Sequence, residues 1–269
     1  MLYGKDKPAI CLMIRQNEDL FCALPGVRDF LERCRNEGFA VSLTDAALSP
    51  SPLSPSSLSP SPLPPLYLTD DAGTAARLKK NGACVIGIGE GGFFPGAAVI
   101  SSFEDLPLDF LLMVYDHDRH IPHQIAVTSR LVIRESVPED YGDIRRMLLS
   151  CREGQDVIGI TKEQMEDRRW FESYVGTVYA LLGYGMWSVL ERNTGALAGW
   201  CGLDDEGRLA YLIDESRRGK GYAIEACRAI AAYARDNLGM EKMRVRCRRD
   251  NEPSVKLALK LGAGIEWTG

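Results

Sequence analysis

The segment that most constrains this chain is the basic, glycine-rich stretch at 217–223. It follows an apolar run at 209–213 and precedes a helical pattern at 224–238. A strand, a glycine-rich turn and a helix in this order present free backbone N–H groups to a phosphate. Gly219 and Gly221 allow positive φ and close backbone approach, and the basic side chains add charge to the helix dipole. The pattern predicts an anion-binding turn; the alternative is an ordinary turn with solvated basic residues.

A second set of signals follows this helix. The alternation at 242–247 predicts a strand. Asn251 and Ser254 then precede a short helical run at 255–261, which Gly262 closes. Together with the glycine-rich turn, these signals favour a functional site.

These segments resemble the signatures of the GNAT superfamily of acyl-CoA N-acyltransferases. The central signature is glutamine or arginine, two residues, glycine, one residue, and glycine or alanine, and it matches Arg218, Gly221 and Ala223. The Asn-x-x-Ser…Leu-Gly pattern matches Asn251, Ser254, Leu261 and Gly262, and the Tyr-x-Ile strand matches Tyr211 and Ile213. The resemblance runs from about Leu131 to the C-terminus and looks closest to the branch that includes the ribosomal-protein alanine acetyltransferases.

The resemblance implies acetyl-CoA as co-substrate and a primary amine as acceptor, on a small molecule or a protein N-terminus. The amine would attack the thioester directly, and a backbone N–H near Leu212 or Ile213 would polarise its carbonyl. The pyrophosphate would rest on the N–H groups of the turn, and the pantetheine arm would lie beside the strand that ends at Ile213. The implied cofactor-binding residues are Leu212, Ile213, Arg218, Gly219, Lys220, Gly221, Tyr222, Ala223, Asn251 and Ser254.

Two positions depart from the catalytic pattern of the family. Many relatives have a tyrosine four residues after Ser254, where this chain has Ala258. Many have a glutamate three residues before Tyr211, where this chain has Arg208. The general acid and the general base are therefore unassigned. These departures favour the alternative of a non-catalytic acyl-CoA-binding or regulatory protein.

Three further features concern the same half. The turn at 204–206 carries three carboxylates, which are candidates for the base, although turn carboxylates are usually only solvated. Tyr184, Met186 and Trp187 either line an acceptor pocket or belong to the core. Relatives often continue into a last strand beyond the position of Trp267, a difference that favours a truncated or weakly active enzyme.

Composition limits the partners and the compartment. A chain of 269 residues is long enough for two domains, and its net charge of −5 gives no argument for nucleic acid or an anionic membrane. The eight cysteines lie mostly in apolar runs without a C-x-x-C pair, as expected in a reducing compartment. No signal-peptide core is present, and no run approaches the roughly 20 apolar residues of a membrane helix. We expect a cytoplasmic protein without a metal, and leave open whether it forms a homodimer.

In the first half, 1–124, short apolar strands alternate with helices, and this pattern predicts a smaller parallel α/β domain. A Ser/Pro/Leu-rich stretch at 49–65 interrupts it and predicts an extended or disordered surface insert. Strands ending in Thr-Asp faintly resemble the haloacid-dehalogenase-like fold. That family's nucleophilic aspartate is missing at 11–17, so a phosphatase lacks its nucleophile and the domain is predicted to be non-catalytic.

Two motifs in this half are interpreted as incidental. The string Gly87-x-Gly89-x-x-Gly92 matches a dinucleotide fingerprint, but Phe-Phe-Pro-Gly follows it instead of a helix. The histidines at 117, 120 and 123 could bind zinc, but Pro122 breaks helical geometry there. We interpret them as solvated linker histidines.

For the second domain, 125–269, the resemblance implies a GNAT fold, which is a mixed, mostly antiparallel sheet with helices on both faces. A strand at 125–134 leads into a helix that begins at Pro138, and a longer helix is predicted at 162–182. Turns at 193–195 and 204–207 predict two successive hairpins. The whole chain is therefore placed in the α/β class.

Overall fold

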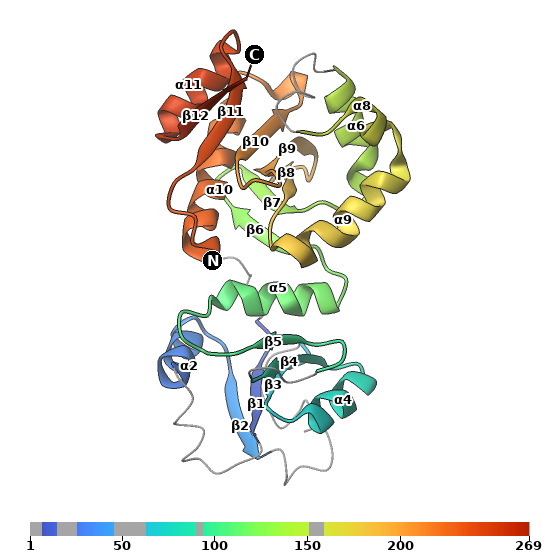
Figure 1. The fold of residues 1–269 in the computed structure, drawn as a ribbon, viewed down its shortest axis with the longest axis vertical. Helices are drawn as coiled ribbons and strands as arrows, with labels where there is room; N and C mark the ends of the chain where they lie inside the picture. Colours follow the sequence, from blue (N-terminus) through green and yellow to red (C-terminus); the bar gives the residue numbers. More distant parts are fainter. Residues whose placement is uncertain (1–6, 15–25, 46–62, 90–93, 151–158, 269) are drawn as a thin grey trace. The chain divides into compact units, whose positions relative to one another are not determined.

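The computed structural model describes residues 7–14, 26–45, 63–89, 94–150 and 159–268 of the chain. The chain divides into two compact units between Ile121 and Pro122 (Figure 1). Most of the insert predicted at 49–65 lies outside the described residues.

The N-terminal unit contains a five-stranded parallel sheet in the order β2-β1-β3-β4-β5. Its strands are β1 Ile10–Ile14, β2 Val41–Asp45, β3 Leu66–Thr69, β4 Cys84–Ile88 and β5 Ala98–Ile100. Its helices are α2 Val27–Asn36, α4 Ala72–Lys80 and α5 Leu108–Asp118. The parallel α/β architecture expected for this half is confirmed, and the order 2-1-3-4-5 is a common doubly wound arrangement.

The core of this unit explains why its strands are continuous apolar runs. Every residue of β3 and β4 is buried, as expected for parallel strands covered on both faces. Phe30 of α2 packs on Phe103 with 4.9 Å between ring centroids, and Leu111 and Tyr115 of α5 join the same core. Helix α5 was not predicted, because its sequence is apolar on most sides and lacks a clear amphipathic period.

The three histidines do not share one environment. His117 lies in the last turn of α5, and His120 is exposed with a left-handed φ of 56°. His123 is fully buried, and its backbone N–H donates to the Glu135 carboxylate at 3.1 Å. The interpretation as solvated linker histidines is therefore wrong for His123. Among the described residues, no group of three or more His, Cys, Asp or Glu side chains is arranged to hold a metal ion.

The C-terminal unit is built on an antiparallel sheet in the order β10-β9-β8-β7-β6, and a separate parallel pair joins β11 to β12. The strands are β6 Gln124–Val127, β7 Leu131–Glu135, β8 Met186–Glu191, β9 Leu197–Leu203, β10 Leu209–Ile213, β11 Arg244–Arg248 and β12 Gly264–Thr268. The helical segments are η1 Pro138–Asp140, α6 Tyr141–Ser150, α8 Lys162–Glu166, α9 Arg168–Leu182, η2 Glu215–Arg217, α10 Tyr222–Leu238 and α11 Glu252–Leu261. The mostly antiparallel sheet and both hairpins are confirmed.

Helices cover both faces of this sheet. Trp187 of β8 belongs to the core under α10 and meets Tyr233 edge to face at 5.6 Å. Trp200 of β9 belongs to the opposite core under α6, α8 and α9, where it lies 6.2 Å from Phe171. Trp187 and Met186 are almost fully buried, so both are core residues. The edge strand β10 pairs with β9 of this sheet, from Leu209 opposite Leu203 to Ile213 opposite Gly199.

Three expectations for this unit are corrected. The stretch 125–134 is a hairpin, because Thr128 and Leu131 exchange hydrogen bonds of 2.8 and 2.9 Å across a turn. The helix at 162–182 is broken at Asp167, whose extended backbone and side chain cap α9 through the Arg169 N–H at 2.9 Å. No strand was predicted after Leu261, but β12 follows it and pairs with β11.

A half-buried carboxylate, that of Asp140 in η1, is hydrogen-bonded to β7 and β8. Burial favours a higher pKa for Asp140, but hydrogen bonds from Arg134, Ser188 and the Val137 N–H outweigh it and hold the pKa below its ordinary value.

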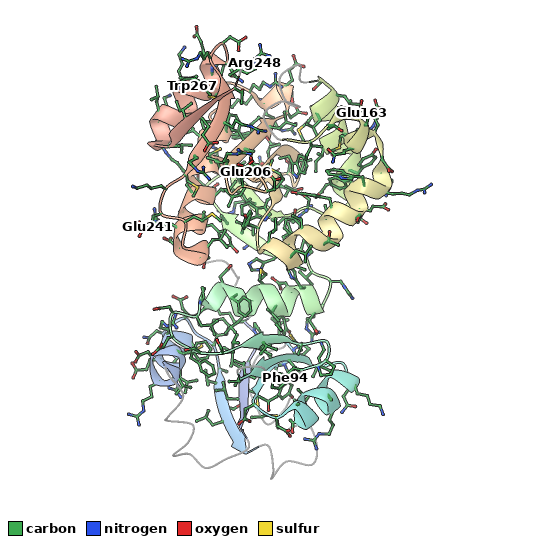
Figure 2. All side chains as sticks on the ribbon, viewed as in Figure 1. Phe94, Glu163, Glu206, Glu241, Arg248 and Trp267 are labelled. Atoms are coloured by element: carbon green, nitrogen blue, oxygen red, sulfur yellow. The ribbon has the colours of Figure 1, made fainter. Side chains whose placement is uncertain are left out.

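The surface carries exposed charges such as Glu163 and Glu241 (Figure 2). No helix in the described part of the chain has the length and apolar character needed to span a bilayer.

Candidate functional site

The turn between β10 and α10 has the backbone that an anion site requires. Gly219 has φ 74° and Gly221 has φ 79°, both in the left-handed region that disfavours side chains. A Cβ on Gly219 would meet no heavy atom within 4 Å, so the need for glycine comes from the backbone and not from crowding. Gly221 is the N-cap of α10, and no side chain caps the helix there. The first N–H groups of α10 are therefore left for a ligand.

A clamp from the β6–β7 hairpin fixes this turn. Arg130 donates to the Lys220 carbonyl at 2.8 Å and to the Glu225 carboxylate at 2.6 Å. Its guanidinium also lies 4.6 Å from the centroid of the Tyr222 ring. Glu225 accepts further bonds from Thr128, and although burial favours a higher pKa, these bonds hold the pKa of Glu225 below its usual value. The Lys220 carbonyl is thus turned away from the N–H groups that begin α10.

The basic residues of the turn play different parts. Arg217 pairs with Glu191 at 3.4 Å and with Asp214 at 3.4 Å, so its charge is balanced within the protein. Arg218 makes no ion pair among the described residues, and its Nε donates to the Ile213 carbonyl at 3.2 Å. Lys220 is exposed. Only Arg218 and Lys220 keep charge for an external anion.

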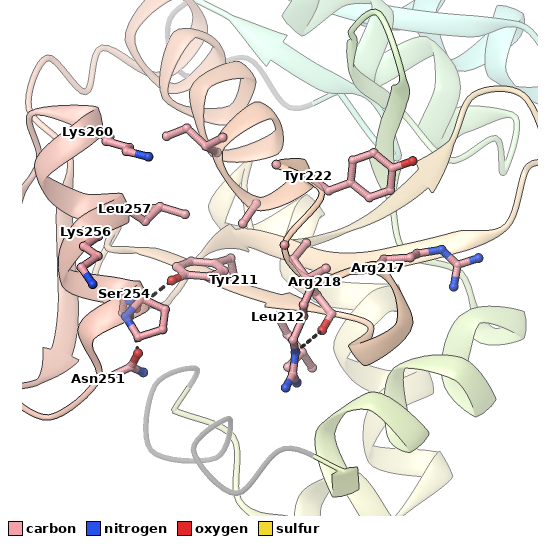
Figure 3. A pocket seen from close by; sticks show the side chains of 16 residues that line it. Tyr211, Leu212, Arg217, Arg218, Tyr222, Asn251, Ser254, Lys256, Leu257 and Lys260 are labelled. Atoms are coloured by element: carbon pink, nitrogen blue, oxygen red, sulfur yellow. Dashed lines mark hydrogen bonds between the residues drawn. The ribbon is translucent and has the colours of Figure 1, made fainter.

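A cavity of about 570 Å³ opens between β10, the start of α10 and α11 (Figure 3). All predicted cofactor-binding residues line it except Lys220. Lys256 and Lys260 of α11 add basic groups to its wall, and sequence reasoning did not identify them. No aspartate, glutamate or histidine is among the described residues that line it. The cavity is therefore suited to an anionic ligand with an apolar portion.

Two hydroxyl groups meet on the wall of this cavity. The Tyr211 hydroxyl of β10 lies 2.8 Å from the Ser254 Oγ of α11 (Figure 3). Ser254 is 2% exposed, and its N–H donates to the Asn251 side chain at 3.1 Å, which caps α11. Burial raises the pKa of Tyr211 to about 12, against a smaller opposing effect of the Ser254 hydrogen bond. Asn251 and Ser254 thus shape the helix end as well as lining the cavity.

The carboxylates considered as the base are engaged elsewhere. Arg208, buried where relatives have glutamate, pairs with Asp204 at 2.8 Å and with Glu206 at 2.7 Å. Asp204 also accepts the N–H groups of Glu206 and Arg208 at 3.0 and 2.9 Å. Asp205 is exposed. Asp204 and Glu206 are therefore held in ion pairs with Arg208, and neither is among the residues that line the cavity.

The family model that describes the acetyltransferase (GNAT) domain matches residues 130–264. The chain belongs to the GNAT acetyltransferase family. Acetyl-CoA is the acetyl donor of this family. The cavity fits this donor, because an uncapped helix start, unpaired basic side chains and an acid-free wall surround it.

Several solved acetyltransferases are similar to about half of this chain. One from Agrobacterium tumefaciens str. C58 is 22% identical, with 51% of this chain and 81% of that chain covered and a TM-score of 0.45. A ribosomal-protein-S5-alanine acetyltransferase from Vibrio fischeri is 14% identical, with 51% and 81% covered and a TM-score of 0.42. A ribosomal L7/L12 alpha-N-protein acetyltransferase in complex with coenzyme A is 17% identical, with 51% and 82% covered and a TM-score of 0.39.

The match does not reach the N-terminal unit, so the haloacid-dehalogenase resemblance there stays a prediction. The glycine motif that matches a dinucleotide fingerprint lies at the end of β4: Gly87 is within the strand and Gly89 follows it. The next described element is the strand β5 and not a helix. Gly92 lies outside the described residues. Sequence reasoning also missed Arg130 and the Tyr211–Ser254 contact, because both join segments far apart in the chain.

Proposed function

We propose that the chain is an acyl-CoA-dependent N-acetyltransferase that moves an acetyl group to a primary amine of a small molecule or a protein N-terminus by direct attack. The observation that carries this proposal is the acid-free cavity at the uncapped start of α10. An acetyl thioester bound there needs both a grip on its phosphates and a donor to its carbonyl.

The chain's own groups supply the grip. Backbone N–H groups between Arg218 and Ala223 hold the pyrophosphate, with the helix dipole behind them. The side chains of Arg218 and Lys220 add charge from the turn, and Lys260 adds charge from the opposite wall, where Lys256 is paired with Glu252 at 2.9 Å. Asn251 and Ser254 contribute from the start of α11.

The open edge of β10 supplies the carbonyl donor. Asp214 donates its N–H to Ala198 of β9, and the Leu212 carbonyl lies 3.9 Å from the Cys201 thiol of the same strand. Because backbone groups alternate along a strand, the N–H of Ile213 turns to the other edge, toward the cavity. Its carbonyl accepts from Arg218 on that side. Of the two residues considered from sequence, Ile213 is therefore the better donor to the acetyl carbonyl.

Among the described residues no carboxylate or imidazole lines the cavity, and in this proposal the amine loses its proton to solvent instead of to a dedicated base. The protein's contribution is then orientation and carbonyl polarisation. The same observation favours a second candidate, a non-catalytic acyl-CoA-binding or regulatory protein.

One experiment separates the two candidates. Coenzyme A binding is measured by calorimetry, and thiol release from acetyl-CoA is followed with a panel of small amines and peptides with free N-termini. We expect binding together with amine-dependent thiol release. Binding without release by any acceptor would support the non-catalytic candidate, and no binding would refute both.

The remaining assignments are also proposals. We place the domain boundary near residue 124, with the acetyltransferase domain at 125–269. The six described cysteines are free and buried, which supports a reducing, cytoplasmic location.

A further inference from the structure

We propose that Tyr211 and Ser254 form a two-hydroxyl proton donor to the sulfur that leaves during acetyl transfer. This inference rests on the proposed function, because it requires an acetyl thioester in the cavity. It assigns the general acid that the sequence left open, and it places that acid on β10 as well as on α11.

A comparison of the hydroxyl groups that line the cavity points to Tyr211 and Ser254. Of the residues that the structure describes, three with hydroxyl side chains line it: Tyr211, Tyr222 and Ser254. The Tyr222 hydroxyl donates its proton in a hydrogen bond to the Glu191 carboxylate at 3.1 Å, so it has no second proton to donate to a ligand. Tyr211 and Ser254 bond to each other at 2.8 Å. They are the hydroxyl groups left for a ligand.

The pair has one proton more than its internal hydrogen bond uses. If Tyr211 donates to Ser254, the serine proton is left over; if Ser254 donates, the tyrosine proton is left over. In the part of the wall that the structure describes, no carboxylate could take that proton. A thiolate forming in the cavity would accept it, because hydrogen bonds to an ionised acceptor are the stronger ones.

The packing around the pair explains the alanine one turn further along α11. A helical side chain covers the turn that precedes its own Cα, so a phenol at position 258 would lie over the turn of Ser254. Ala258 is fully buried and carries no hydroxyl. Tyr211 packs against the cluster that includes Ala258 and brings a phenol to the same turn from the strand.

The proton balance is complete with solvent. Transfer forms a C–N bond and breaks a C–S bond, while the attacking amine loses one proton to water. The Tyr211–Ser254 pair gives one proton to the departing sulfur and recovers one from water. No oxidant, metal or further reactant is required.

The test measures the pKa of the thiol of coenzyme A bound to the full chain. The ultraviolet absorbance of the thiolate is titrated, and the same titration with desulfo-coenzyme A is subtracted. In Tyr211→Phe and in Ser254→Ala the bound thiol should ionise about tenfold less readily, a rise of about one pKa unit. Thiol release with a reactive amine should fall in the same two variants.

Tyr222→Phe is the matched control, because it removes a cavity phenol that belongs to Glu191. We expect it to leave the pKa of the bound thiol as in the wild type. An unchanged thiol pKa in either Tyr211→Phe or Ser254→Ala, with coenzyme A still bound, would overturn the inference and leave the proposed function standing. Failure of the wild type to bind coenzyme A would instead refute the proposed function itself. Because the two variants alter different elements, either folded variant suffices for the test.

Discussion

Replacing Gly221 by alanine tests the anion-binding turn through its backbone. The residue has φ 79°, and a Cβ there would lie 3.5 Å from the Arg130 guanidinium, an ordinary contact. The penalty therefore comes from the left-handed backbone, which costs about 1–2 kcal/mol for a residue with a Cβ. If the turn relaxes to avoid this strain, binding must restore it, and the dissociation constant for coenzyme A should rise roughly 5- to 30-fold.

Gly239→Ala provides the matched control for this prediction. Gly239 ends the same helix with φ 67°, and a Cβ there meets no heavy atom within 4 Å. Both variants should lose similar stability, a fall in Tm of roughly 2–8 °C for a unit of this size. Only Gly221→Ala should bind coenzyme A more weakly in calorimetry. Wild-type affinity in Gly221→Ala, or equal weakening in Gly239→Ala, would refute the reasoning.

Three further changes test other parts of the structure. Arg130→Met removes the side chain that holds the Lys220 carbonyl. Calorimetry should show about tenfold weaker coenzyme A binding, which is the loss expected for one charge-assisted hydrogen bond. Unchanged affinity would show that the clamp is dispensable. Asp140→Asn should lower the free energy of unfolding by about 1–3 kcal/mol at neutral pH, since it weakens the bond to Arg134. The pKa of Asp140 is held low, so its stabilising contribution is present above the ordinary aspartate pKa of about 4 and is lost as the pH falls through the lower folded-state value. Urea titrations should therefore show the difference between wild type and Asp140→Asn shrinking at acid pH, and a constant difference would contradict the assignment. Arg208→Met leaves Asp204 buried without its partner and should cost about 3–5 kcal/mol in the same urea assay, whereas near-wild-type stability would show that this pair is not needed.

Local chemistry made much of this fold predictable. The turn at 193–195 and the glycines of the anion turn carry their conformational requirement in their own residue types. The break at Asp167 was missed because a capping aspartate inside an apolar periodic run resembles any other polar position. Helix α5 was missed for a different reason: burial on most sides removes the periodicity that marks a helix.

The site was predictable only where the binding groups belong to the backbone. The turn and the start of α10 follow from consecutive residues. The clamp joins Arg130 to Lys220, and the hydroxyl pair joins Tyr211 to Ser254, across long stretches of chain. Such contacts depend on which strand lies beside which helix, and no local pattern in one sequence encodes that placement.

A crystal structure of the chain with coenzyme A tests the central claim most directly. The account predicts the pyrophosphate against the backbone N–H groups of 218–223 and the sulfur within hydrogen-bonding distance of the Tyr211–Ser254 pair. Coenzyme A bound elsewhere, with the start of α10 open to solvent, would contradict it.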